Sequence, residues 1–294
     1  MRPFSRAALT TLFWFVVSRL SAQDPQTLLA RANEAYRSLR AAEAADLYRQ
    51  YLARYPDRAD VRVFLGGALL NLDELQGALD EANRAIALDP RYAKGYVLAG
   101  RALSARQLWS QAQVCFGKAQ GLDPRDLDAW YFSGRAFYDA SRFEPAIEAF
   151  QRAVRIAPEQ TRIYENLGLA EDALGQFELA EKSFRKAVDL AQGAWRPYLA
   201  YGAFLFRQDR AVESLPMLRK ALSLAPDSVD VRFEFARVLY QQNSLQDAAQ
   251  VLEPALPSNE CRVHNLLARI YSVRGNTAMA DAQVQAINGC KGSP

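Results

Sequence analysis

A proline recurs every 34 residues along most of this chain of 294 residues. The recurring positions are Pro56, Pro90, Pro124, Pro158 and, after one period without a proline, Pro226. A fixed period of about 20–50 residues predicts a solenoid, in which one supersecondary unit is stacked repeatedly on itself. A proline after a helix stops that helix and begins the turn to the next unit. The period therefore favours a repeat architecture and argues against a compact catalytic domain.

Small residues recur in the same register as the prolines. Rows of the period begin near residues 25, 59, 93, 127, 161, 195, 229 and 261. A small column in the first half of the rows holds Gly66, Gly100, Gly134, Gly168, Gly202 and Ala236, and one in the second half holds Ala44, Ala78, Ala112, Ala146, Ala180, Ser214 and Ala248. Glycine inside a helix costs roughly 1 kcal/mol relative to alanine. We therefore expect these positions to be small because two antiparallel helices cross closely there.

A bulky column follows the second small column by four residues. It holds Tyr48, Phe116, Phe150, Phe184, Leu218 and Leu252. A further column holds Ala85, Ala119, Ala153, Ala187, Ala221 and Ala255. The bulky side chains are expected to fill the space between neighbouring hairpins.

These columns resemble the tetratricopeptide repeat, whose pattern runs aromatic, Leu-Gly, a Tyr-like residue, then Ala, Phe, Ala and Pro. The fourth row carries it as Trp130, Gly134, Phe137, Ala146, Phe150, Ala153 and Pro158. The resemblance covers about residues 25–292. It implies an all-α fold, a right-handed superhelical solenoid of about eight helix-turn-helix hairpins that occupies residues 23–292. A ligand of such a solenoid is expected on the surface lined by the first helices.

The C-terminal rows depart from the pattern. Pro254 lies where the second helix of the seventh row should still run, and Pro257 follows it, so we expect that helix to kink or end early. The eighth row begins about two residues early, at Cys261. Cys261 and Cys290 lie at the two ends of this last hairpin, which antiparallel helices bring together, so a disulfide is favoured over two free thiols. Cys115 is expected to remain a free packing residue.

Residues 1–22 have the pattern of a secretory signal peptide. Arg2 and Arg6 precede an apolar run from Ala7 to Val17, and Ala22 offers a small residue for cleavage. The apolar run is too short to span a bilayer. An uncleaved anchor is the alternative, because Arg19 lies close to the cut. We expect a periplasmic or secreted protein with no membrane span after cleavage. The absence of any Asn-X-Ser/Thr acceptor favours a bacterial origin.

The charges and polar residues exclude several functions. The whole chain has 36 basic and 33 acidic residues, but residues 1–22 contribute three Arg and no acid, so the remainder is neutral. This balance, with no recognisable motif, argues against nucleic-acid binding. His264 is the one histidine, in a column that otherwise holds Tyr or Trp, and is expected to pack rather than catalyse. No metal-ligand spacing or phosphate-binding loop occurs, so we expect no enzyme, cofactor or metal.

The exposed stripe of the first helices carries the candidate binding residues. They are Arg101, Tyr131, Arg135, Tyr138, Phe206, Arg207, Phe233, Arg237, Tyr240 and Arg269. Aromatic and Arg side chains are enriched at binding hot spots, and Arg grips carboxylates in a bidentate manner. The stripe therefore predicts a groove for a peptide of acidic or C-terminal carboxylate character. Alternatively, Arg135 pairs with Glu165 or Asp172 of the neighbouring row and only links repeats.

These features favour an exported protein-interaction scaffold that holds a peptide or partner helix in its groove. Two alternatives stay open. One is a self-assembling structural protein, which the polar tail Lys291–Pro294 disfavours, so a monomer is expected over an oligomer. The other is a regulatory subunit of an envelope enzyme or of a secretion complex.

Overall fold

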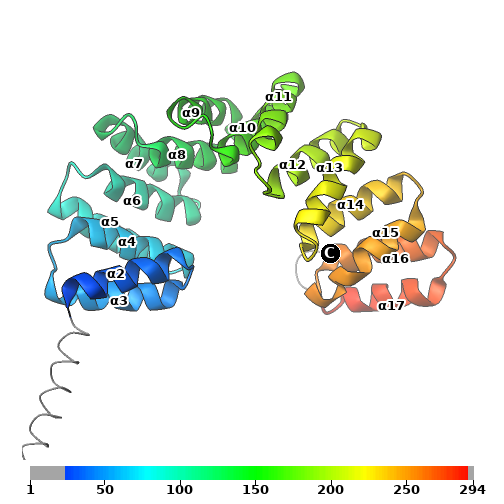
Figure 1. Ribbon diagram of the computed structural model, residues 1–294, viewed down its shortest axis with the longest axis horizontal. Coiled ribbons are helices and arrows are strands. Elements are labelled where there is room, and N and C mark those ends of the chain that lie inside the picture. The colour runs from blue at the N-terminus through cyan, green and yellow to red at the C-terminus, as the bar shows by residue number, and fades with distance from the viewer. Residues whose placement is uncertain (1–23, 291–294) are drawn as a thin grey trace, which may run out of the picture. The chain divides into compact units, whose positions relative to one another are not determined.

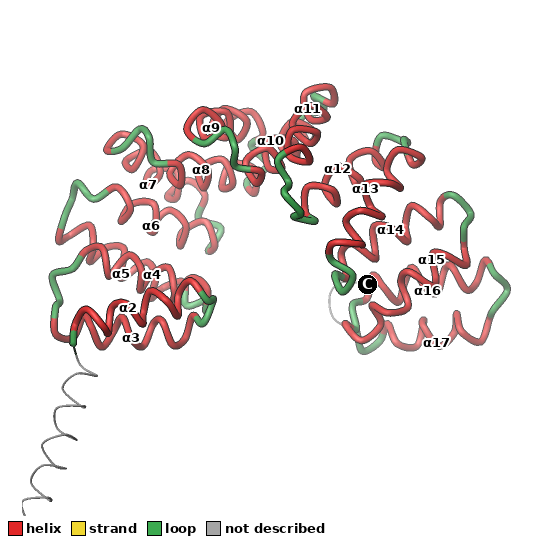
Figure 2. The backbone as a smooth tube through the Cα atoms, in the orientation of Figure 1, coloured by secondary structure: helices red, strands yellow, loops and turns green. Residues whose placement is uncertain are grey.

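The computed structural model describes residues 24–290. Within that range the regular elements are sixteen α-helices and one short 3-10 helix, joined by short loops (Figure 2). The α-helices pair into eight successive antiparallel hairpins (Figure 1). The predicted all-α solenoid of helical hairpins is thereby confirmed. The predicted signal peptide lies outside the described residues.

The chain divides into two compact units, Met1–Ile156 and Ala157–Pro294. The first unit contains four hairpins: α2 (Pro25–Arg37) with α3 (Ala41–Arg54), α4 (Ala59–Asn71) with α5 (Leu75–Leu88), α6 (Ala93–Ala105) with α7 (Trp109–Leu122), and α8 (Leu127–Asp139) with α9 (Phe143–Ile156). Each second helix also packs on the first helix of the next hairpin in the unit. Consecutive first helices α4, α6 and α8 touch one another, so their exposed faces form a continuous surface.

The second unit contains the other four hairpins. They are α10 (Thr161–Ala173) with α11 (Phe177–Asp189), α12 (Arg196–Arg207) with α13 (Ala211–Leu224), α14 (Val229–Gln241) with α15 (Leu245–Leu252), and α16 (Cys261–Val273) with α17 (Thr277–Ile287). The first helices α10, α12, α14 and α16 touch in sequence. Within each unit, the first helices that touch one another therefore place their exposed faces on one surface of that unit.

Every hairpin turn has the same backbone geometry. One residue in the left-handed region follows each first helix, with φ between 56° and 79°: Leu39, Asp73, Gln107, Ser141, Gly175, Asp209, Asn243 and Gly275. The next residue donates its N–H to a carbonyl five residues earlier, as Arg40 does to Ala35 at 2.9 Å. This is the Schellman arrangement, which satisfies the last carbonyls of the helix. The backbone alone therefore closes the turn, and only two of the eight positions hold glycine.

The recurring glycines leave room for side chains, which are phenylalanine rings at Gly100, Gly134 and Gly168, and not for a neighbouring backbone. A Cβ added at Gly134 would lie 2.7 Å from a ring carbon of Phe150 in the same hairpin, and one added at Gly100 would lie 2.6 Å from Phe116. Each of these rings is fully buried. This corrects the sequence interpretation, because at Gly100, Gly134, Gly168 and Gly202 the small residue of a first helix accommodates the bulky residue of its own second helix.

The seventh hairpin ends early, as its prolines predict. Helix α15 stops at Leu252, and Pro254 and Pro257 lie in the 3-10 helix η1 (Glu253–Ser258). Asn259 then adopts a left-handed conformation with φ 54° before α16 begins. The interior prolines remove backbone donors that a longer α15 would need, which explains its eight residues.

Two carboxylates of the second unit lie in opposite environments. Glu171 of α10 is buried and accepts a hydrogen bond from the Ser183 hydroxyl at 2.6 Å, and burial raises the pKa of its carboxyl above the ordinary 4.5. Glu181 of α11 accepts from Arg210 at 2.9 Å and from the Tyr201 hydroxyl at 3.0 Å. The hydrogen bonds from Arg210 hold the pKa of Glu181 below 4.5.

Candidate functional site

Five of the predicted binding residues line one open pocket in the second unit. The pocket has a volume of about 720 Å³ and is built from α12, α14 and α16. Its lining residues, here called the arginine pocket, are Phe206, Phe233, Arg237, Tyr240, Gln241, Arg262, Asn265, Leu266 and Arg269. The packing of consecutive first helices thus gathers stripe residues from three repeats into one site.

Aromatic rings hold two of these guanidinium groups in place. The Arg237 guanidinium lies over the Phe206 ring, 5.2 Å from its centroid, and over the Phe233 ring at 5.8 Å. The Arg262 guanidinium lies 5.0 Å from the centroid of Phe233. Cation–π contacts of this kind contribute roughly 0.5–2 kcal/mol each. The stack orders the cations before a ligand arrives, which lowers the entropic cost of binding.

The three arginines differ in how far acidic neighbours neutralise them. Arg237 pairs with Glu234 at 2.8 Å, and Arg262 pairs with both Asp230 and Glu260. Arg269 is exposed and forms no ion pair with any residue in the described range. None of the described residues that line the pocket is acidic. Arg269 is therefore the cation most available to a carboxylate ligand.

A smaller pocket in the first unit collects two more predicted residues. Arg101 of α6 and Arg135 of α8 line a space of about 280 Å³ together with Phe132 and Asp139. The Arg101 guanidinium lies 4.4 Å from the centroid of the Phe132 ring. Arg135 faces Asp139, one turn along its own helix, at 3.9 Å. This pocket repeats the aromatic–arginine pattern but has less than half the volume and contains a carboxylate.

Three predicted residues lie elsewhere. Tyr131 is only 6% exposed and packs against the Phe150 ring, so its assignment to the binding stripe is wrong and it belongs to the core. Tyr138 packs against the Phe143 ring and does not line the pocket of the first unit. Arg207 pairs with Asp172 of α10 at 2.6 Å. The alternative of an arginine that links repeats thus applies to Arg207.

Sequence reasoning missed Arg262 as part of the arginine pocket. Arg262 lies one turn N-terminal to Asn265, so extending the stripe of the last first helix by three residues would have included it. The predicted stripe contains positions at spacing i, i+4 and i+7 of each first helix, and in the last one it begins at Asn265. The position of Arg262 is basic in three other repeats, at Lys94, Arg162 and Arg196, and acidic in three, at Asp60, Asp128 and Asp230, so its residue type varies from repeat to repeat.

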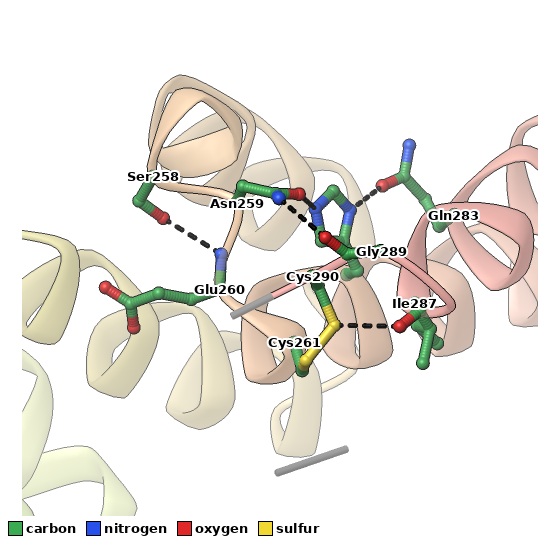
Figure 3. The surroundings of a disulfide bond; sticks show 9 residues. Ser258, Asn259, Glu260, Cys261, Gln283, Ile287, Gly289 and Cys290 are labelled. Carbon is green, nitrogen blue, oxygen red and sulfur yellow. Dashed lines mark hydrogen bonds between the residues drawn. A yellow bond between two sulfur atoms is a disulfide. The ribbon is translucent and has the colours of Figure 1, made fainter. Parts of the chain in front are cut away.

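The last hairpin is closed by a disulfide between Cys261 and Cys290, whose Cα atoms are 5.1 Å apart (Figure 3). Beside it, Asn259 donates to the Gly289 carbonyl at 3.1 Å. His264 is 6% exposed, with one ring nitrogen 2.8 Å from the Gln283 amide oxygen and the other 3.2 Å from that of Asn259. His264 is therefore a buried residue of the last hairpin, and both of its ring nitrogens contact amide oxygens. Cys115 is free and half-buried in α7.

Comparison with known proteins identifies the repeats. Three family models described as Tetratricopeptide repeat match the chain, at residues 29–93 and 97–161, at 161–193 and at 205–270. No curated protein matches it by sequence. Among the described residues, no helix is long and apolar enough to cross a membrane, and no group of three His, Cys, Asp or Glu side chains is placed to hold a metal ion.

Solved structures share the fold at low identity. A structure of the APC/C hetero-tetramer Cut9-Hcn1 is 19% identical with a TM-score of 0.66, covering 89% of this chain. This chain spans 52% of that protein, about half its length. Pseudomonas aeruginosa pilF is 21% identical with a TM-score of 0.59, covering 73% of this chain and 95% of pilF.

Proposed function

Because this chain belongs to the tetratricopeptide repeat family, we propose that it is a protein-interaction scaffold whose second unit binds an acidic partner segment in the arginine pocket. The observation that carries the proposal is the lining of that pocket. Three arginines and three aromatic residues converge there with no described acidic residue among them. The tetratricopeptide repeat generally serves as a non-catalytic scaffold, and we propose no reaction for this chain.

The arginine side chains of the pocket favour a partner that carries carboxylate groups. Arginine offers two parallel donors to a carboxylate, and such charge-assisted bonds are stronger than neutral ones. Arg237 and Arg262 are already oriented by the Phe233 ring, while Arg269 is left open. A segment with Asp or Glu side chains, or with a free C-terminal carboxylate, supplies acceptors for Arg269 and for the donors that Arg237 and Arg262 do not already give to Glu234, Asp230 and Glu260.

We also propose that the protein is exported and monomeric. Residues 1–22 support export, as does the disulfide, because such bonds persist in oxidising compartments. Mass spectrometry of protein purified from its native envelope or medium tests cleavage after Ala22, and retention of residues 1–22 contradicts it. Light scattering tests the monomer, which a mass that rises with concentration contradicts.

A random-peptide display selection tests the binding proposal. Purified residues 24–294 serve as bait, beside the variants Arg269→Glu and Arg219→Glu. Arg219 is an exposed arginine of the second helix α13 and does not line the arginine pocket. We expect the parent and Arg219→Glu to enrich acidic peptides, and Arg269→Glu to lose that enrichment.

Two results would overturn the proposal. One is that the parent enriches no acidic peptides. The other is that Arg269→Glu and Arg219→Glu select the same peptides, which would place the interface away from the arginine pocket. Matching circular dichroism spectra of the variants ensure that a loss reflects binding and not unfolding.

A further inference from the structure

The space opposite the small column of each first helix is filled in the hairpins that precede the last one. The six bulky-column residues Tyr48, Phe116, Phe150, Phe184, Leu218 and Leu252 are each 0% exposed. The second hairpin has Ala82 in that column, and Leu98 from the next hairpin fills the space instead, since a Cβ added at Gly66 would overlap the Leu98 side chain. A neighbouring element therefore completes the packing when the hairpin's own side chain is too small.

The last hairpin lacks this filling. The repeat register places Ala268 in the small column and Val284 in the bulky column. Val284 is 55% exposed, and an open cavity of about 440 Å³ lies against it. The lining of this terminal cavity is Tyr240, Asn265, Ala268, Arg269, Ser272, Val273, Ala280, Asp281, Val284 and Ile287. Helix α15 is covered by the first helix of the next hairpin, α16. No described helix covers the face of α17 that carries Val284 in this way.

The terminal cavity adjoins the arginine pocket. Tyr240, Asn265 and Arg269 line both spaces. An extended segment that places a carboxylate on Arg269 therefore has the terminal cavity within reach of a nearby side chain. Asp281 is the acidic residue of the cavity lining, so the acidic part of the segment is expected over Arg237 and the apolar part over α17.

We infer that the last hairpin binds an aromatic side chain of the same partner segment, which takes the place that a phenylalanine ring occupies in the third, fourth and fifth hairpins. The inference rests on the proposed function and specifies its ligand as a peptide with an acidic group followed by an aromatic residue. The cavity has apolar walls from Ala268, Val273, Val284 and Ile287. In the third, fourth and fifth hairpins the corresponding space encloses a phenylalanine ring.

Fluorescence anisotropy with matched peptides tests the inference. The probes are short fluorescein-labelled peptides that carry an acidic block followed by one Phe, with spacers of graded length, and the same peptides with Ala in place of Phe. Burial of a phenyl ring is expected to tighten binding to the parent protein by about 10- to 100-fold for the best spacer.

Two variants separate the terminal cavity from the arginine pocket. Val284→Phe fills the cavity with the ring that the register specifies, and should reduce binding of the Phe peptide to that of the Ala peptide while leaving the Ala peptide unaffected. Val212→Phe is the matched control, because Val212 is 76% exposed on α13 and lines neither space. Arg269→Glu should weaken both peptides.

Each failure has a distinct signature. If neither peptide binds the parent protein, the proposed function fails. If both bind equally, or if the Phe advantage survives in Val284→Phe, the inference alone fails. A melting temperature of Val284→Phe well below that of the parent contradicts the assigned shape of the cavity. Dimerisation of the parent that Val284→Phe abolishes would make a second copy the occupant and overturn the peptide assignment.

Discussion

The pairing of Gly134 with Phe150 makes a prediction about stability that runs against helix propensity. Replacing a mid-helix glycine with alanine should gain about 1 kcal/mol. A Cβ at Gly134, however, would lie 2.7, 2.8 and 3.0 Å from three atoms of a fully buried ring. Overpacking a tight core costs about 1–3 kcal/mol, and three close contacts place this case in the upper part of that range. We expect Gly134→Ala to lower the free energy of unfolding by about 1–2 kcal/mol.

The chain supplies both the control and the compensating change. Gly117 lies inside α7 with nothing within 4 Å of an added Cβ, so Gly117→Ala should stabilise by about 1 kcal/mol. The seventh hairpin pairs Ala236 with Leu252, both fully buried. The double variant Gly134→Ala/Phe150→Leu recreates that pair and should be more stable, by about 1–2 kcal/mol, than the sum of the single changes.

Urea unfolding followed by circular dichroism measures these changes, with the dependence on urea checked for each variant because repeat proteins can unfold in stages. Gly134→Ala as stabilising as Gly117→Ala would refute the assigned packing. Strict additivity of Gly134→Ala and Phe150→Leu would do the same.

Three further predictions follow from the second unit. Removing the disulfide with Cys261→Ser/Cys290→Ser opens a loop with a sequence separation of 29 residues, and in the chain-entropy model this should destabilise the last hairpin by about 3–4 kcal/mol. Hydrogen exchange measures the effect, and we expect it to become faster in α17. Unchanged exchange would contradict the prediction. The folded-state pKa of Glu171 is raised, so the folded protein loses stability as pH rises from 4.5 through that pKa. Glu171→Gln should therefore raise the melting temperature at pH 7 and have little effect on it at pH 4. The pKa of Glu181 is lowered instead, so the stability that its ionised carboxylate contributes is present above pH 4.5 and is lost as pH falls through the lowered pKa. Glu181→Gln should therefore lower the melting temperature at pH 7. Melting curves in which both variants shift in the same direction would reject these assignments.

Much of the fold could be predicted because the packing requirement repeats at a fixed spacing. The 34-residue register coincides with first helices that begin at Ala59, Ala93, Leu127, Thr161 and Val229. The fifth row lacks the proline, and there the linker contains two successive left-handed residues, Gln192 and Gly193, with α12 starting one residue late.

The left-handed hairpin turns could not be predicted. The residue at that position is Leu, Asp, Gln, Ser, Gly or Asn, so no side-chain type marks it. Hydrogen bonds from the turn backbone to the last carbonyls of the first helix set the conformation, as between the Arg40 N–H and Ala35, and these bonds involve no side chain.

The candidate site was predicted in composition but not in extent. Residue types on the first helices identified Phe206, Phe233, Arg237, Tyr240 and Arg269, since helical spacing places them on one face. The burial of Tyr131 could not be read from spacing, because the Phe150 ring of the second helix in the same hairpin packs against it. The terminal cavity depends on what is absent from the last hairpin and required the packing of the other seven for comparison.

The disulfide also has a mechanical consequence for the last hairpin. A force applied to the chain beyond Cys290 passes through the sulfur atoms to Cys261 and bypasses α16 and α17. The enclosed 29-residue separation corresponds to about 100 Å of extended chain. When the oxidised protein is stretched between its ends, that length stays hidden from the pulling device, and a reducing buffer returns it. The final repeat is therefore shielded from tension in the oxidised protein.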